Sequence, residues 1–147
     1  MKQFDRIIIG GGAAGMFAAG FAGQRGERVL VLEKRERPAR KILVTGKGRC
    51  NLTNNCTPQQ FIAAVRRNPR FLMSAAYAFP PQQTMAVFEG LGVPLKTERG
   101  GRVFPVSDRA MDIADADNNP SFKKRRYGVE NGLGFHAVKV DILLKVG

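Results

Sequence analysis

Four residues near the start of the chain have the types and spacing that bind a dinucleotide. Gly10, Gly12 and Gly15 satisfy the pattern GxGxxG, and the acidic Glu33 follows at close to the usual interval of about 20 residues. The first glycine of such a turn permits a sharp bend, the second lets the backbone approach a pyrophosphate, and the third lets helix and strand pack closely. The carboxylate accepts hydrogen bonds from ribose hydroxyls and repels a 2′-phosphate. The pattern therefore favours FAD or NAD over NADP.

The elements that must position this turn are predicted on both sides of it. Residues 4–9 are an isoleucine-rich run typical of a buried strand, and residues 28–32 (RVLVL) are a second such run. Between them, residues 13–24 are small or apolar without proline, which predicts a helix. Gly26 stands where a helix end favours a left-handed residue. The order predicts a βαβ unit with a right-handed crossover.

A second glycine-containing segment, KILVTGKGRCNLTNN, spans residues 41–55. Gly46 and Gly48 bracket Lys47, so the amides of this loop could face an anion. Lysines and arginines are dense across residues 34–49, where Glu36 is the only acid. Two interpretations of these charges stay open, a solvated loop and a surface that faces phosphates.

The later elements are predicted mainly from caps, prolines and apolar spacing. Thr57 and Gln60 form a capping box around Pro58, which starts a helix. Glycines between two short β runs predict a hairpin. The predicted segments are helices over 58–67, 70–78, 82–91 and 108–116, and a hairpin over 95–104, with a weak strand signal over 137–144. The apolar positions expected in the core are Phe61, Val65, Phe71, Met73 and Phe88.

Composition and charge exclude some classes of protein. No apolar run reaches the roughly 20 residues that span a bilayer, and Asp5 interrupts the basic start that a signal peptide needs. We therefore expect a cytoplasmic protein without membrane contact. Cys50 and Cys56 have no second pair to complete a zinc site, so we expect reduced thiols and no metal. The net charge of +12 suits a phosphorylated ligand or a polyanion.

Taken together, the motifs resemble one family. The motifs are GGGAAG at 10–15, LEK at 32–34, RKIL at 40–43, TGKGRCNLTN at 45–54 and GRVFPVSDRA at 101–110. They look like the N-terminal part of the bacterial HI0933-like flavoproteins, which are NAD(P)/FAD-dependent oxidoreductases. The GRCNLTN motif is the specific one, because other Rossmann proteins lack it. Lys47 stands where many members have glycine.

The resemblance implies FAD bound in an extended pose, with NAD(P)H admitted as electron donor and a small-molecule substrate in the full-length family. Residues 10–15 would cradle the pyrophosphate, Glu33 would bind the adenosine ribose, and Arg40 and Lys41 would face the phosphates or the ribityl edge. Residues 48–51 would lie beside the flavin. No catalytic residue and no oligomeric state follow from it. The expected cofactor-binding residues are Gly10, Gly12, Ala13, Ala14, Gly15, Glu33, Lys34, Arg40, Lys41, Gly48, Arg49, Cys50 and Asn51.

The resemblance also implies the fold and its limits. The class is α/β, a Rossmann-like FAD-binding βαβ unit followed by helices and a β-hairpin, forming an incomplete FAD-binding domain. We expect this domain over residues 1–116, because the family continues with a long helix there and the chain does not. Residues 117–147 have two interpretations, an out-of-frame end and a native tail with the basic quartet 123–126.

Two functions are compatible with this sequence. The first is an FAD-dependent oxidoreductase, or the N-terminal fragment of one, in which the flavin transfers a hydride. The second is a non-enzymatic nucleotide-binding or basic RNA-associated module, suggested by the net charge. The sequence contains no recognisable RNA-binding motif, so nucleic acid is not the expected partner.

Overall fold

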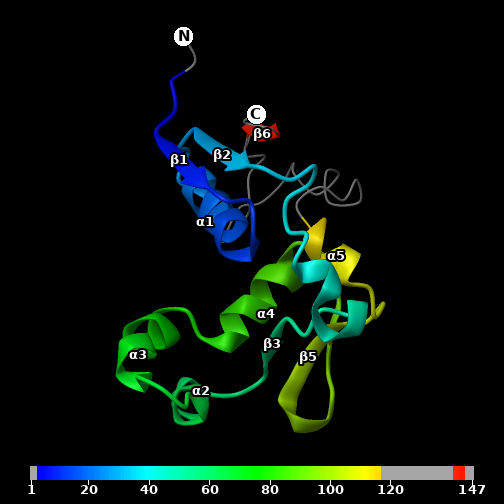
Figure 1. The fold of residues 1–147 in the computed structure, drawn as a ribbon. Helices are drawn as coiled ribbons and strands as arrows, with labels where there is room; N and C mark the ends of the chain where they lie inside the picture. Colours follow the sequence, from blue (N-terminus) through cyan, green and yellow to red (C-terminus); the bar gives the residue numbers. More distant parts are fainter. Residues whose placement is uncertain (1–2, 117–140, 145–147) are drawn as a thin grey trace.

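The computed structural model describes residues 3–116 and 141–144, and its elements form two small sheets with helices around them (Figure 1). The class is α/β, as expected. The first sheet is parallel and has the order β1-β2-β6, with Ile8 of β1 opposite Val31 of β2. The bounds of its parts are β1 Arg6–Ile9, α1 Ala13–Gln24, β2 Val29–Glu33 and β6 Asp141–Leu144. The predicted βαβ unit is therefore present. Of the strand predicted over residues 137–144, the part that the structure describes is confirmed as β6, and residues 137–140 lie outside the described ranges.

Helix α1 packs closely on one face of this sheet because the residues between them are small. Ala19 and Ala22 of α1 are fully buried against Val29 and Val31 of β2. Burying a valine side chain contributes about 1.5–3 kcal/mol, so this contact is a main source of stability for the unit. Gly26 follows α1 with φ of 81°, the left-handed conformation expected at the helix end.

The second sheet is antiparallel and joins two distant sequence motifs. Its order is β3-β5-β4, with bounds β3 Thr53–Asn54, β4 Leu95–Thr97 and β5 Arg102–Pro105. Strands β4 and β5 form the predicted hairpin around the turn η2, Arg99–Gly101. Strand β3 was expected to be loop, because a strand of two residues has no periodicity to detect. It forms because Thr53 pairs with Val103 and the Leu52 amide donates to the Val103 carbonyl at 2.9 Å.

Four further helices complete the described part of the chain. Their bounds are α2 Pro58–Ala64, α3 Pro69–Ala78, α4 Pro81–Gly90 and α5 Ala110–Ala114. The predicted capping box is confirmed: the Gln60 amide donates to the Thr57 hydroxyl at 3.2 Å, and the Thr57 amide donates to the Gln60 side chain at 2.9 Å. Helices α2 and α3 pack on each other and, like the hairpin that contains β5, lie at the end of the structure away from β1 and β2 (Figure 1).

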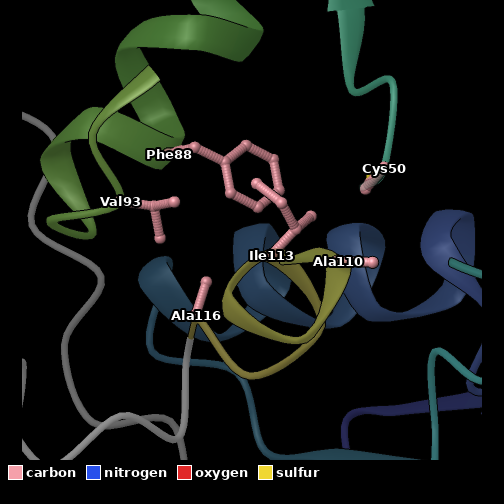
Figure 2. Packing of buried hydrophobic residues seen from close by; sticks show 6 residues of the cluster. All are labelled: Cys50, Phe88, Val93, Ala110, Ile113 and Ala116. Atoms are coloured by element: carbon pink, nitrogen blue, oxygen red, sulfur yellow. The ribbon is translucent and has the colours of Figure 1, made fainter. Parts of the chain in front are cut away.

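One apolar cluster connects helix α1 of the βαβ unit with the later helices and the second sheet. Figure 2 shows Phe88 of α4 and Ile113 of α5 facing each other, with Cys50 approaching from a separate segment. Phe17 of α1 packs against the cluster, and its ring lies 6.1 Å from that of Phe88. Leu43, in the turn η1 (Ile42–Gly48), also contacts it. Packing of these side chains therefore sets how the βαβ unit sits on the rest of the domain.

Of the five apolar positions predicted to lie in the core, the prediction is wrong for three, all of them in α2 and α3. Phe88 is buried and Val65 is partly buried, but Phe71 is 82% exposed, Met73 44% and Phe61 37%. Apolar spacing identifies a helix face, but it does not supply a partner for that face. Within the described residues, no helix is long and apolar enough to cross a membrane. Most of residues 117–147, including the basic quartet, lies outside the described ranges.

Candidate dinucleotide-binding site

The glycine turn lies where strand β1 passes into helix α1. Gly10 has φ of 98°, and its amide donates to the Leu32 carbonyl at 2.8 Å, which holds the turn against the end of β2. A Cβ on Gly15 would overlap the Gly10 carbonyl oxygen, because the first turn of α1 lies against the turn that precedes it. The close packing expected of the third glycine is therefore present.

Gly12 occupies the N-cap of α1 and faces open space. A Cβ at this position would meet no atom within 4 Å. No side chain caps the helix, and its first turn contains no acidic residue. The first amides of a helix have no partner within it, so the exposed Ala13 and Ala14 present donors at the positive end of the helix dipole. This end of α1 has the space, the donors and the polarity for an anionic group.

Glu33 ends strand β2 and is bound to the turn itself. Its Oε2 accepts from the Gly11 amide and its Oε1 accepts from the Arg35 amide, both at 2.8 Å. These bonds, that from Arg35 first, hold the pKa of the Glu33 carboxyl below its ordinary value of 4.5. Each carboxylate oxygen has further lone-pair capacity for a ligand.

Gly11 is a site residue that the GxGxxG pattern does not identify. A Cβ on it would lie 3.0 Å from Cβ of Pro38 and 3.2 Å from Oε2 of Glu33. Its carbonyl accepts from the Ala39 amide at 2.7 Å. The position therefore has to stay small so that the basic loop can close over the turn. The pattern allows any residue there, and only the triplet of glycines in the sequence marks it.

The basic loop, residues 34–41, returns to the glycine turn through Ala39. Ala39 is buried with φ of 57°, and Arg37 anchors the loop to the end of α5 through Asp115, with 2.6 Å between Nη2 and Oδ1. Lys34, Arg40 and Lys41 are exposed and make no ion pair with any residue that the structure describes. The basic loop therefore carries three cationic side chains, unpaired among the described residues, that could contact an anionic ligand, and the loop itself is hydrogen-bonded to the glycine turn.

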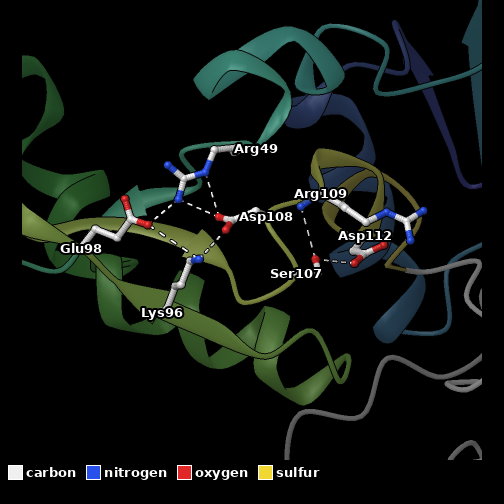
Figure 3. Close-up of polar contacts among 7 residues, drawn as sticks. All are labelled: Arg49, Lys96, Glu98, Ser107, Asp108, Arg109 and Asp112. Atoms are coloured by element: carbon white, nitrogen blue, oxygen red, sulfur yellow. Dashed lines mark hydrogen bonds and ion pairs between the residues drawn. The ribbon is translucent and has the colours of Figure 1, made fainter.

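The GKGRCN segment places Arg49 in a network of charges (Figure 3). The Arg49 guanidinium lies between Glu98 and Asp108, donating to both, and Nε is 2.8 Å from Oδ1 of Asp108. Lys96 bridges the same two carboxylates, at 2.6 Å from Asp108. The guanidinium also lies 4.1 Å from the centroid of the Phe104 ring. Arg49 therefore connects this segment to the β4–β5 hairpin.

Cys50 is 5% exposed, and its side chain belongs to the apolar cluster. Burial raises the pKa of its thiol, because the thiolate would lose its hydration there. Gly48 has φ of 84° and, like Asn51, is exposed. Cofactor contacts by residues 48–51 stay a prediction.

The structure brings the expected residues into two groups. The first comprises the turn 10–15, Glu33 and the basic loop, joined by the bonds from Gly11 and Ala39. The second is the GKGRCN segment, joined to the hairpin by Arg49. Helix α1, which follows the turn of the first group, contacts the apolar cluster through Phe17, and the second group contributes Cys50 to it.

A parallel βαβ unit with a glycine turn at the helix N-terminus defines the Rossmann class of α/β domains. Within that class, the chain belongs to the family described as the HI0933-like protein Rossmann domain, whose model matches residues 4–132. The matched range extends beyond residue 116, and the domain boundary expected there stays a prediction.

Three curated relatives are similar to the chain. The ribosomal RNA dihydrouridine synthase of Escherichia coli is 40% identical over 116 residues, which is 78% of this chain and 28% of that protein. The 3-dehydro-bile acid delta(4,6)-reductase of Clostridium scindens is 33% identical over 137 residues, 91% of this chain and 32% of that protein. The ribosomal RNA dihydrouridine synthase of Haemophilus influenzae is 33% identical over 106 residues, which is 71% of this chain and 26% of that protein. The chain thus spans about a third or less of these relatives.

Proposed function

We propose that the chain forms the FAD-binding part of a flavin-dependent oxidoreductase. The observation that carries this proposal is the open, uncapped N-terminus of α1 at Gly12, next to the carboxylate of Glu33. The unpaired amides suit a pyrophosphate, and a carboxylate at the end of β2 suits a ribose without a 2′-phosphate. Membership of the HI0933-like family supports FAD as the dinucleotide.

Each residue of the site has a separate task in this proposal. The amides of Ala13 and Ala14 bind the pyrophosphate, and Glu33 binds the adenosine ribose while it holds Gly11 in place. Lys34, Arg40 and Lys41 balance the phosphate charge from the basic loop. Gly48 and Asn51 line the flavin end, where their exposure leaves the backbone accessible. When bound, the flavin would supply hydride transfer, with NAD(P)H as the source of electrons.

The names of the relatives support one reaction class. Dihydrouridine is uridine with the carbon–carbon double bond of its base saturated, and the bile acid enzyme is named as a reductase. Both names fit the addition of two electrons and two protons across a double bond conjugated with a carbonyl. We favour a uracil base in RNA as the substrate, because two of the relatives act on ribosomal RNA by name and one of them has the higher identity. This choice differs from the small molecule expected from the sequence.

Titration of the chain with FAD tests the cofactor assignment. Gly12→Val places a side chain in the open space where the pyrophosphate would lie, so this variant should fold but lose FAD absorbance after gel filtration. Gly90→Val is the matched control, because a Cβ on Gly90 also meets no atom within 4 Å and lies at the end of α4.

Three outcomes separate the possibilities. FAD retained by Gly90→Val and lost by Gly12→Val supports the proposal. Equal FAD binding by both variants would remove the turn from the site. A folded chain that binds RNA but no FAD would favour the alternative, a non-enzymatic RNA-associated module.

A further inference from the structure

Helix α3 exposes aromatic side chains that nothing in the described structure covers. Phe71 is 82% exposed and Tyr77 is 49% exposed, while the neighbouring α2 exposes Phe61 at 37%. Exposing a large aromatic ring to water is unfavourable, and exposed apolar side chains that gather in one patch mark interaction sites on soluble proteins. The buried residue of α3 is Ala76, so the aromatic side chains were not needed for the core.

The same hairpin carries three arginines without acidic neighbours. Arg66 and Arg67 lie in the α2–α3 connection, and Arg70 lies in the first turn of α3. All three are exposed and form no ion pair with any described residue. From Glu36 to Glu89 the intervening sequence contains no acid and eight lysines and arginines. The surface therefore has a positive charge that the surrounding sequence does not neutralise.

Helices α2 and α3 pack on each other, so this helical hairpin carries all of these side chains on one part of the structure. Within α3, Arg70 and Tyr77 are seven positions apart and share one stripe, and the exposed Phe71 lies about 100° around the helix from Arg70. We name the set formed by Phe61, Arg66, Arg67, Arg70, Phe71 and Tyr77 the α2–α3 surface. Helices α2 and α3 lie away from β1 and β2, so the surface is separate from the glycine turn (Figure 1).

We infer that the α2–α3 surface is a docking site for single-stranded RNA. Arginines contact phosphates and exposed aromatic rings stack on unpaired bases, which is the combination that single strands require. The inference rests on the proposed function in that RNA is the substrate proposed there. The α2–α3 surface would bind a part of the RNA strand that flanks the uracil base to be reduced.

Two other occupants fit this surface less well. A second copy of the chain in a symmetric contact would bring three arginines against three arginines. A helix that lies on a membrane separates an apolar face from a polar face, whereas in α3 the exposed Arg70 and Tyr77 share one stripe. A single strand of RNA uses both the cations and the rings.

Fluorescence anisotropy with a short fluorescein-labelled single-stranded RNA tests the inference on the 147-residue chain. Arg66→Gln/Arg67→Gln/Arg70→Gln should weaken binding about tenfold or more, and should reduce the slope of log affinity against log salt concentration by about 2. Phe71→Ala should weaken binding about fivefold or more, and Phe71→Tyr should restore it, because tyrosine also stacks. The matched control Arg99→Gln/Arg102→Gln/Arg109→Gln removes the same charge from exposed arginines that, like those of the α2–α3 surface, form no ion pair with any described residue.

Photo-crosslinking with RNA that contains 4-thiouridine gives a second measurement that needs no variant. The inference requires crosslinks on residues 58–78, found by mass spectrometry of the digested chain. Crosslinks confined to other segments, or equal loss of affinity in the two triple variants, would overturn it. Binding of the chain to anionic vesicles but not to RNA would also overturn the inference. The same holds if sedimentation shows that the chain self-associates and that Phe71→Ala abolishes this self-association. FAD titration of the same variants separates this inference from the proposed function, because loss of RNA binding with normal FAD binding concerns the α2–α3 surface alone.

Discussion

The Gly11 amide donates to the Glu33 carboxylate at 2.8 Å, which joins the turn after β1 to the end of β2. The Gly11 carbonyl in turn accepts from Ala39 in the basic loop. One glycine thus connects the acidic residue expected to recognise a ribose with the loop expected to balance phosphates. Because Glu33 has this structural role in addition to the proposed one, its removal should affect the turn as well as the ligand.

Glu33→Gln should weaken FAD about tenfold or more, because a neutral amide loses the charge-assisted bonds to the ribose and to Gly11. Isothermal titration measures the affinity, and Glu36→Gln is the control, since Glu36 is exposed in the same loop. Unchanged affinity in Glu33→Gln would exclude Glu33 from the ligand site.

Gly15→Ala should destabilise folding by about 2–4 kcal/mol, because its Cβ would overlap the Gly10 carbonyl oxygen and push α1 away from β1. Urea unfolding followed by circular dichroism gives the free energy. Gly90→Ala has open space around its Cβ and should stay within about 1 kcal/mol of the parent chain. Similar stability of the two variants would mean that the packing of α1 on the turn is not as tight as described.

Acid should weaken the connection made by Arg49. Hydrogen bonds from Arg49 lower the pKa of Glu98, and hydrogen bonds from Lys96 and Arg49 lower that of Asp108, below ordinary values of 4.5 and 3.8. A lowered carboxyl pKa stabilises the fold above the ordinary value, and this contribution is lost as the pH falls through the folded pKa. The thermal midpoint of the chain should therefore fall below about pH 4 more steeply than that of Asp108→Asn. If the thermal midpoints of the parent chain and of Asp108→Asn fell equally with pH, the ion pairs of Asp108 would not stabilise the fold.

Cys50 should react with iodoacetamide more slowly than Cys56 at pH 8. Burial raises the pKa of the Cys50 thiol and excludes the reagent, whereas Cys56 is only partly buried and both cysteines are free. Mass spectrometry of timed samples gives the two rates, and unfolding in urea should make them similar. A faster reaction at Cys50 in the folded chain would place its thiol outside the apolar cluster.

Local patterns in the sequence were sufficient to predict the βαβ unit. Three glycines between two isoleucine- and valine-rich runs specify a sharp turn whatever the rest of the chain does, and helix α1 has the predicted bounds, Ala13–Gln24. The capping box at Thr57 is confirmed for the same reason, because its bonds join residues three positions apart. The hairpin β4–β5 also follows from neighbouring residues.

Long-range contacts decided what the local patterns could not. The sequence contains no signal that Gly11 would contact Glu33, that Arg49 would pair with Glu98 and Asp108, or that Phe71 would stay uncovered. Periodicity and capping depend on residues a few positions apart, whereas these features depend on which distant segment packs alongside. The sequence by itself therefore determined the glycine turn of the βαβ unit and the family. Only the tertiary structure decided that Arg49 and Cys50 connect distant segments and that α3 exposes aromatic and basic side chains to solvent.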